Sequence, residues 1–245
     1  MSSSLILCMA GRNTRFHDVG FDIPKYLLPW KNEVIITSIL REIISQYNFR
    51  DILLLANKRD IHFKNNLISA LNVIGLNDKN VYYIGDTDGQ AHTAMLGVDL
   101  IKDKSSCVMI HNADTLIINR NFNMIENMLS TNDAYVDVFV ANSPSYCYVR
   151  ANGNNVIDII EKKCISPYAS SGLYAFKSPQ TYIKAFSSTI DIFKKKELYI
   201  SDVLKQLIAD GGHVLINDLE HMSETCVLGT PYEYGLAFAK TRLER

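Results

Sequence analysis

Three cationic side chains follow the first apolar run of the chain. The run LILCMA, residues 5–10, is followed directly by Gly11, Arg12 and Arg15, and after a short segment by Lys25. A guanidinium group can bind two phosphate oxygens at once, whereas an ammonium group is a point charge that can follow a moving oxygen. These residue types therefore fit a bound polyphosphate better than a single carboxylate, although an ordinary solvated loop can carry the same charges.

Carboxylates that could take part in the same chemistry occur later in the chain. Asp114 comes two residues after an apolar run at 107–112. Mg²⁺ prefers a few carboxylates, waters and substrate phosphates, so one aspartate and triphosphate oxygens could hold the ion, but Asp114 could instead be a turn residue. Glu161 and Lys162 form an adjacent acid–base pair at the end of an apolar run. Such a pair could bind a polar ligand, or it could consist of ordinary cross-strand surface charges. His111 lies on the opposite strand face from Asp114, and we interpret it as incidental.

Hydrophobic periodicity indicates the elements that must position these residues in the first half of the chain. The expected strands are 5–10, 51–57, 81–85 and 107–112, and the expected helices are 34–47, 64–75 and 90–101. Because fully apolar strands alternating with helices are typical of buried parallel sheets, we predict an α/β fold with a mixed, mostly parallel sheet covered by helices on both faces. Ligands of such folds lie at the carboxyl ends of the strands, where Arg12, Arg15 and Asp114 occur.

The second half of the chain has a different pattern. Its expected strands are 134–141, 146–151, 155–162 and 171–177, and its expected helices are 179–188, 200–211 and 230–244. These strands alternate more strongly and are separated by Asn, Gly, Ser and Pro, which indicates antiparallel strands added to the sheet edge. Since the chain has no repeat and no low-complexity linker, residues 1–245 are predicted to form a single domain.

Composition excludes several classes of protein. The net charge is −1 over 245 residues, so no overall basic field would draw the chain to nucleic acid or to an acidic membrane. The apolar stretch at the N-terminus is much shorter than the roughly 20 residues of a transmembrane helix. The five cysteines are scattered and show no metal-binding spacing. We therefore expect a cytoplasmic protein with neither nucleic acid nor a membrane as its partner.

The segments MAGRNTRF and PKYLLPW (9–16 and 24–30) resemble the signature of sugar-phosphate nucleotidyltransferases, or nucleoside-diphosphate-sugar pyrophosphorylases. In that signature a loop of the form G-x-G-[ST]-R leads to P-K. The resemblance continues in order through GQAHTAMLG (89–97), IHNADTLI (110–117), EKKCISPYASSGLYAF (161–176), YISDVLKQLI (199–208) and LGTPYEYGLA (228–237). Such enzymes join a nucleoside triphosphate to a sugar phosphate and release pyrophosphate. The resemblance implies a glycosyltransferase-A-like (Rossmann-like) fold in a short member, with residues 1–115 as nucleotide-binding half and 116–245 as acceptor-binding half.

The resemblance also implies roles for individual residues. Arg15 and Lys25 are the expected catalytic residues, Arg15 on the leaving pyrophosphate portion and Lys25 on the α-phosphate and the attacking phosphate. Asp114 is the expected ligand of a Mg²⁺ cofactor. The expected nucleotide-binding residues are Met9, Ala10, Gly11, Arg12, Asn13, Thr14, Gly89, Gln90 and Ala91. The expected acceptor-binding residues are Glu161 for sugar hydroxyls, Lys162 for the sugar phosphate, and Gly172, where the acceptor would lie against the backbone.

Two departures from the family pattern stand out. The second glycine of the loop is Asn13, at a position that often has a positive φ, which asparagine tolerates better than other residues with a side chain. We expect the loop to survive with this side chain near the phosphates. Many members have an aspartate two residues before the Gly-Thr pair at 229–230 that completes the magnesium site, whereas this chain has Val227. Asp218 is a speculative replacement.

Three functions are compatible with these residues. The leading one is a magnesium-dependent nucleotidyltransferase that supplies precursors for surface polysaccharides, acting on a nucleoside triphosphate and a sugar phosphate or similar small phosphate. A glycosyltransferase of the same fold usually has an Asp-x-Asp motif, whereas this chain has Asn112 at its first position. A non-catalytic nucleotide-sugar-binding regulator is favoured by Val227 alone. A homodimer is the default assembly.

Overall fold

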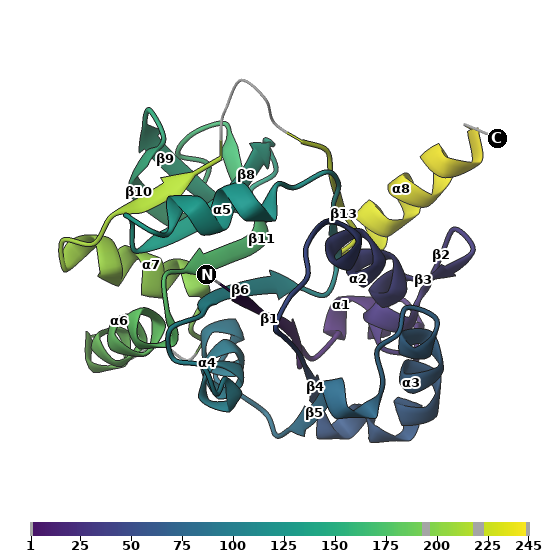
Figure 1. Cartoon of the computed structure of the whole chain (residues 1–245). Coiled ribbons are helices and arrows are strands. Elements are labelled where there is room, and N and C mark those ends of the chain that lie inside the picture. The colour runs from purple at the N-terminus through teal and green to yellow at the C-terminus, as the bar shows by residue number, and fades with distance from the viewer. Residues whose placement is uncertain (1, 193–196, 218–222, 244–245) are drawn as a thin grey trace.

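A nine-stranded sheet forms the centre of the computed structural model, which describes residues 2–192, 197–217 and 223–243 (Figure 1). The strand order is β5-β4-β1-β6-β11-β8-β12-β10-β9. The strands of the first half are β1 (Ser3–Met9), β4 (Asp51–Asn57), β5 (Val81–Ile84) and β6 (Cys107–Asn112). They pair in parallel, with β1 between β4 and β6. Their carboxyl ends therefore lie at one edge, as the sequence predicts.

Antiparallel strands continue the sheet beyond β6. They are β11 (Tyr168–Phe176), β8 (Ala134–Val140), β10 (Asn155–Glu161) and β9 (Cys147–Asn152), together with the short β12 (Val214–Ile216), which pairs in parallel with β8. β9 also pairs with β11, so the strands β11-β8-β12-β10-β9 close into a five-stranded ring. The mixed α/β fold is confirmed, but the sheet as a whole is not mostly parallel. Short connections such as the β9–β10 turn can join antiparallel neighbours only, because a parallel pair needs a longer crossover.

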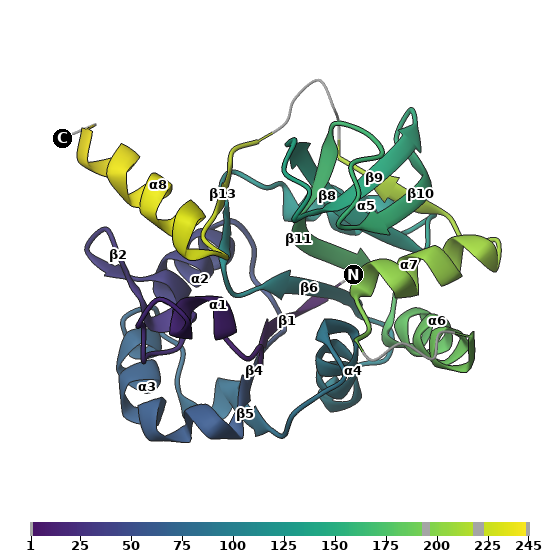
Figure 2. The same cartoon turned by 180° about the vertical axis from the view of Figure 1, so that it is seen from behind.

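Helices cover both faces of the sheet, as predicted. They are α1 (Thr14–His17), α2 (Ile35–Gln46), α3 (Lys64–Asn72), α4 (Gln90–Leu100), α5 (Phe122–Met128), α6 (Pro179–Ile192), α7 (Ile200–Ala209) and α8 (Pro231–Leu243). Side chains of β1 alternate between two cores: Leu5 and Leu7 pack with α2 and α3, whereas Ile6 packs with α4 and α7. Figure 2 shows α4, α6 and α7 on one side of the sheet and α1, α2 and α3 on the other.

Short elements complete the chain. The 3-10 helices are η1 (Lys25–Leu27), η2 (Lys58–Phe63) and η3 (Asp78–Asn80). The pair β2 (Pro29–Trp30) and β3 (Glu33–Val34) forms a small hairpin, and β7 (Thr115–Ile117) pairs with β13 (Thr225–Val227). Among the helices of the described ranges, none combines the length and the hydropathy that a bilayer-spanning segment needs.

Candidate functional site

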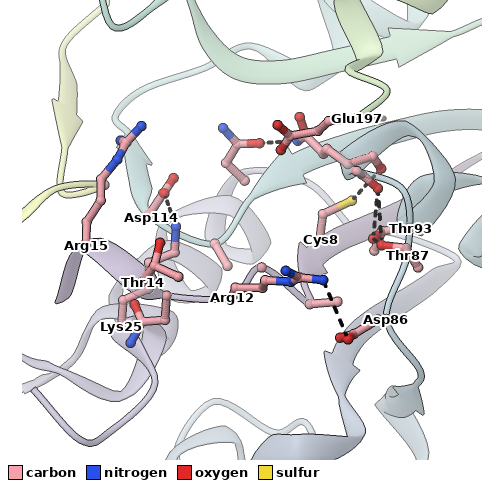
Figure 3. A pocket seen from close by; sticks show the side chains of 18 of the residues that line it. Cys8, Arg12, Thr14, Arg15, Lys25, Asp86, Thr87, Thr93, Asp114 and Glu197 are labelled. Atoms are coloured by element: carbon pink, nitrogen blue, oxygen red, sulfur yellow. Dashed lines mark hydrogen bonds and ion pairs between the residues drawn. The ribbon is translucent and has the colours of Figure 1, made fainter. Parts of the chain in front are cut away.

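Two joined cavities lie at the carboxyl edge of the parallel strands. The first, of about 670 Å³, is lined by residues 10–16, by Lys25 and by residues 86–90. The second, of about 350 Å³, is lined by Glu161, Lys162 and residues 170–172. The two cavities share the residues Arg15, Lys25, Gln90, Asn112, Asp114, Glu197 and Gly229. Figure 3 shows labelled residues of the first cavity, including Arg12, Arg15, Lys25 and Asp114.

Most residues of the predicted site line these cavities, but Met9 and Ala91 do not. Met9 is buried in the core beneath the loop. Ala91 is fully buried, and its N–H donates to the carbonyl of Leu198 (3.1 Å). Both residues therefore support the first cavity from behind rather than face it.

The loop after β1 has the backbone that the sequence predicts at Asn13. This residue has φ 58° and ψ 19°, in the left-handed region. Its Nδ2 donates to the carbonyl of Ile23 (3.1 Å), and its own carbonyl accepts the N–H groups of Phe16 and His17 (3.1 Å each). The Asn13 amide thus holds the loop against the segment before Lys25, and because Asn13 also lines the first cavity, its place near bound phosphates stays a prediction.

Lys25 and Asp114 form an ion pair where the two cavities join. Lys25 begins η1, and its Nζ lies 2.5 Å from Oδ2 of Asp114. The two side chains are 27% and 15% exposed, so water screens the pair only in part. Burial raises the pKa of the Asp114 carboxyl, but the Lys25 charge and the hydrogen bonds from Lys25 and Thr115 outweigh burial, and the net pKa is below its usual value. Asp114 is therefore ionised near neutral pH.

His111 holds the turn that presents Asp114, a role that sequence interpretation missed. The ring is fully buried, and its Nε2–H donates to the carbonyl of Thr115 (2.8 Å). Burial lowers the pKa of His111, which keeps the ring neutral. Strand alternation does place the two side chains apart, but the chain turns back after Asn112, and this turn brings Thr115 over the His111 ring. Strand periodicity alone carries no signal for that contact.

The position of the expected second carboxylate is apolar. Val227 in β13 pairs with Thr115 in β7, directly beside Asp114. Asp218, the speculative replacement, lies outside the described residues. Within the described ranges, no group of three or more His, Cys, Asp or Glu side chains has the arrangement of a metal site.

Glu233 supplies a carboxylate near Asp114 that sequence interpretation also missed. A Cβ atom added to Gly229 would lie 3.0 Å from Oδ2 of Asp114 and 3.8 Å from Oε2 of Glu233, so the two carboxylates flank the same glycine. Thr230 Oγ1 donates to Glu233 Oε2 (2.8 Å), and the Tyr146 hydroxyl donates to Oε1. The sequence signal at these positions was the helix-capping pattern Thr-x-x-Glu, which does not distinguish a cap from a site residue.

Comparison with known proteins decides the family. The model of the family described as nucleotidyl transferase matches residues 4–221. The chain belongs to the nucleotidyl transferase family. The sequence resemblance is thereby confirmed at the level of the family. No curated protein sequence matches the chain significantly.

Solved structures share the fold of this chain. A nucleoside-diphosphate-sugar pyrophosphorylase from Vibrio cholerae RC9 is 22% identical with a TM-score of 0.82, covering 96% of this chain and 99% of that one. A UDP-glucose pyrophosphorylase complexed with UDP-glucose is 19% identical with a TM-score of 0.76, covering 100% of both chains. An inositol-1-phosphate CTP transferase from T. maritima is 14% identical with a TM-score of 0.72, covering 95% and 91%.

Two glycines of the site lie so close to other residues of the chain that a side chain would not fit. A Cβ atom at Gly89 would lie 2.7 Å from the backbone N of Leu198, and one at Gly172 would overlap the amide of Asn112. Both glycines also have positive φ, 111° and 86°. The approach of a base to Gly89 and of an acceptor to Gly172 stays a prediction, and the contacts with Leu198 and Asn112 give a second reason for glycine at both positions.

Asn112 links the two cavities and was not among the predicted site residues. Its Oδ1 accepts a hydrogen bond from Nε2 of Gln90, and its amide rests on Gly172. Through Asn112 of β6, these contacts join the helix α4 to the strand β11. Sequence interpretation used Asn112 only to argue against an Asp-x-Asp motif, and nothing in the local sequence predicts its partners.

Glu161 and Lys162 lie at the far wall of the second cavity. Glu161 Oε1 accepts from the Ser201 hydroxyl (2.6 Å), and burial raises the pKa of the Glu161 carboxyl. Lys162 Nζ donates to the hydroxyl of Tyr199 (3.1 Å), which in turn donates to Glu197 (2.6 Å). The hydrogen bond with Tyr199 raises the pKa of the Lys162 ammonium. The cavity thus offers a carboxylate, an ammonium and hydroxyl groups to a small polar ligand.

Proposed function

We propose that this chain transfers the nucleotidyl group of a nucleoside triphosphate to a small phosphorylated acceptor, a sugar phosphate first of all, and releases pyrophosphate. The observation that carries the proposal is the Lys25–Asp114 pair at the junction of two cavities. The first cavity has the loop and arginines suited to a triphosphate, and the second has the hydrogen-bonding groups suited to a polyol. A reaction between ligands of the two cavities would take place beside Lys25.

The chemistry requires an in-line displacement at the α-phosphorus. An oxygen of the acceptor phosphate forms the new bond to phosphorus, the bond to the bridging oxygen of the β-phosphate breaks, and pyrophosphate leaves with that electron pair. Two anions must meet for this step, so neutralising and positioning charges provide most of the catalysis. Lys25 would stabilise the α-phosphate and the attacking phosphate, and Arg15 the leaving pyrophosphate. Gly11, Arg12 and residues 13–14 would hold the triphosphate, and Gln90 would face the base.

The acceptor would occupy the second cavity. Glu161 would accept hydrogen bonds from hydroxyl groups, since an ionised carboxylate is purely an acceptor. Lys162 would exchange its contact with Tyr199 for the acceptor phosphate. Tyr146 and Ser171 line the same cavity and could complete a polar wall for a polyol. The reaction would take place in the cytoplasm, and its products would serve as precursors for surface polysaccharides.

Magnesium is the cofactor that the resemblance implies, and the donor set fits it. Asp114 and Glu233 offer carboxylate oxygens on either side of Gly229, whose missing side chain leaves space at that point. Oxygen ligands of this kind are those that Mg²⁺ prefers, together with water and substrate phosphates. Asp114 and Glu233 are therefore the residues that would hold it, in place of the aspartate that Val227 replaces. When bound, the ion would supply positive charge to the phosphates.

A pyrophosphate-release screen tests the proposed function. It crosses CTP, UTP, GTP, ATP and dTTP with sugar-1-phosphates and other small phosphates, with and without Mg²⁺. We expect release from one nucleotide that depends on one acceptor, and omission of the acceptor controls for simple hydrolysis. Release without any acceptor dependence would contradict a transferase.

A second candidate is a non-catalytic nucleotide-binding regulator, which Val227 favours. A regulator needs the first cavity, but it has no need for the charge pair at the junction. This candidate would be supported if calorimetry shows nucleotide binding while no combination in the screen releases pyrophosphate.

A further inference from the structure

Arg59 connects two segments that line the first cavity. Its Nη2 donates to the carbonyl oxygens of Ala10 (2.7 Å) and Gly11 (3.0 Å). Its Nη1 donates to Oδ1 of Asp86 (3.1 Å). One guanidinium group thus fastens the phosphate loop after β1 to the segment after β5 that precedes the predicted base-binding residues.

The fold places Arg59 for this task. Met9 of β1 and Ala56 of β4 are partners in the parallel register, so the residues after β4 lie beside the residues after β1. Asn57, which is almost fully buried, accepts the N–H of Arg59 (2.9 Å) through Oδ1 and donates to Asp86 (3.0 Å) through Nδ2. Arg59 therefore leaves the strand in a direction fixed by a buried side chain.

The two carbonyl contacts determine where the loop N–H groups point. A trans peptide unit is planar, and its N–H points opposite to its C=O. Since the carbonyls of Ala10 and Gly11 face Arg59, the N–H groups of the same peptide units, those of Gly11 and Arg12, face away from it. Gly11 and Arg12 line the first cavity. The contacts of Arg59 with the two carbonyls thus orient the N–H groups of Gly11 and Arg12 toward an anion bound in that cavity.

The guanidinium group of Arg59 is itself committed to the protein. Nη1 and Nη2 carry the three hydrogen bonds above, and Nε lies 3.9 Å from Oδ1 of Asp60. Arg12 differs, because its pair with Asp86 spans 3.9 Å and both side chains are largely exposed. Such an exposed pair is weak, so Arg12 remains available to a ligand whereas Arg59 does not.

We propose that Arg59 is a positioning residue for the triphosphate: it orients the loop N–H groups and couples the phosphate loop to the base segment through Asp86. The proposal rests on the proposed function, because it assumes that the first cavity holds a nucleoside triphosphate. No motif in the sequence marks Arg59, which lies in the unremarkable stretch NKRD at 57–60.

Replacement of Arg59 provides the test. In Arg59→Ala we expect the KM for the nucleotide to rise about ten- to a hundredfold, the cost of a misplaced binding group, with the KM for the acceptor unchanged within about twofold. Arg59→Lys should be intermediate, because one ammonium cannot reproduce the fork across both carbonyls and Asp86. The matched control is Arg41→Ala, which removes two hydrogen bonds from a guanidinium group to Oε2 of Glu33, at a place outside both cavities.

Calorimetric binding keeps the test independent of turnover. Titration with CTP, UTP, GTP, ATP, dTTP and inorganic pyrophosphate should show weaker binding of the favoured nucleotide and of pyrophosphate in Arg59→Ala, and no change in Arg41→Ala.

The outcomes separate the two proposals. A wild-type chain that binds a nucleotide without releasing pyrophosphate refutes the proposed function, while the binding series still decides the role of Arg59. Three results would overturn the positioning role of Arg59. They are unchanged nucleotide and pyrophosphate affinity in a folded Arg59→Ala variant, wild-type nucleotide affinity in Arg59→Lys, and equal weakening of acceptor and nucleotide binding in Arg59→Ala. A wild-type chain that binds no nucleoside triphosphate would overturn both.

Discussion

Substituting Lys25 and Asp114 singly and together distinguishes the contribution of this ion pair to catalysis from its contribution to folding stability. Lys25→Met removes the ammonium and leaves the Asp114 carboxylate without its partner in a mostly buried place. A fully buried orphan charge costs roughly 3–5 kcal/mol. Since the side chains here are 27% and 15% exposed, we expect a smaller loss, about 1–3 kcal/mol of the free energy of unfolding.

Activity should respond much more strongly than stability. Lys25 is the cation proposed to stabilise the reacting phosphates, and we expect kcat/KM for pyrophosphate release to fall about a thousandfold, which is about 4 kcal/mol of transition-state stabilisation. In the double variant Lys25→Met/Asp114→Asn neither side chain is charged. We therefore expect stability to recover by about 1–2 kcal/mol relative to Lys25→Met while activity stays low.

The pH dependence has a definite sign. The folded-state pKa of Asp114 is lowered, so its contribution to stability is present above the usual aspartate pKa, about 4, and is lost as the pH falls through the folded value. In Lys25→Met burial dominates and raises that pKa. The stability difference between wild type and Lys25→Met should therefore shrink as the medium is acidified.

The assays are urea unfolding at several pH values and steady-state pyrophosphate release, with Lys102→Met as a control at an exposed lysine outside both cavities. Recovery of activity in the double variant would refute the catalytic role of Lys25. A coupling energy near zero between the two substitutions would refute the ion pair as a source of stability.

Three further predictions test other parts of the site. Glu233→Gln should weaken the binding of Mn²⁺ to the nucleotide-bound chain by about tenfold, measured by calorimetry. Adding Val227→Asp should restore the Mn²⁺ affinity, because a carboxylate then returns beside the metal position. Unchanged Mn²⁺ affinity in Glu233→Gln would remove that residue from the cation site. Gly172→Ala should lower the free energy of unfolding by about 2–4 kcal/mol in denaturant titrations, since the new Cβ meets the Asn112 amide at a residue with φ 86°, and wild-type stability would show that the amide relaxes freely. Burial raises the pKa of Glu161 above the usual value of about 4.3, so the KM for the acceptor should rise as the pH falls through that raised pKa. Glu161→Gln should abolish this pH dependence. A KM that does not change with pH in the wild type would contradict the role of the carboxylate.

Local patterns in the sequence predict the elements because each pattern reflects burial along one segment. The strand at 51–57 and that at 107–112 agree with the structure at both ends, because a short apolar run that ends in polar residues fits a strand buried on both faces of a sheet. The pairing of β7 with β13 joins segments about half the chain apart, and each has three residues. Such short strands have no period of their own, and so they could not be predicted.

The candidate site shows the same division between local and distant information. Asn13 could be predicted to adopt positive φ, because this is a property of one residue in one loop. The reasons for Gly89 and Gly172 could not, because the atoms that exclude a Cβ there belong to Leu198 and Asn112. Residue types thus indicate where chemistry takes place, whereas the packing partners that fix its geometry come from other segments.

Backbone hydrogen bonds of Leu198 connect the segment at 197–199 with the segment at 88–91, and residues of both segments line the cavities. Leu198 donates its N–H to the carbonyl of Asp88 (2.6 Å), and its own carbonyl accepts the N–H of Ala91 (3.1 Å). Main-chain hydrogen bonds of this kind do not depend on which side chains the paired residues carry. Tyr199 lines the second cavity but not the first, so it can be exchanged in a library of variants while the hydrogen bonds of Leu198 are kept, whereas Glu197 lines both cavities. The fold therefore offers Tyr199 as a position at which a changed acceptor preference could be selected with the lining of the first cavity left intact.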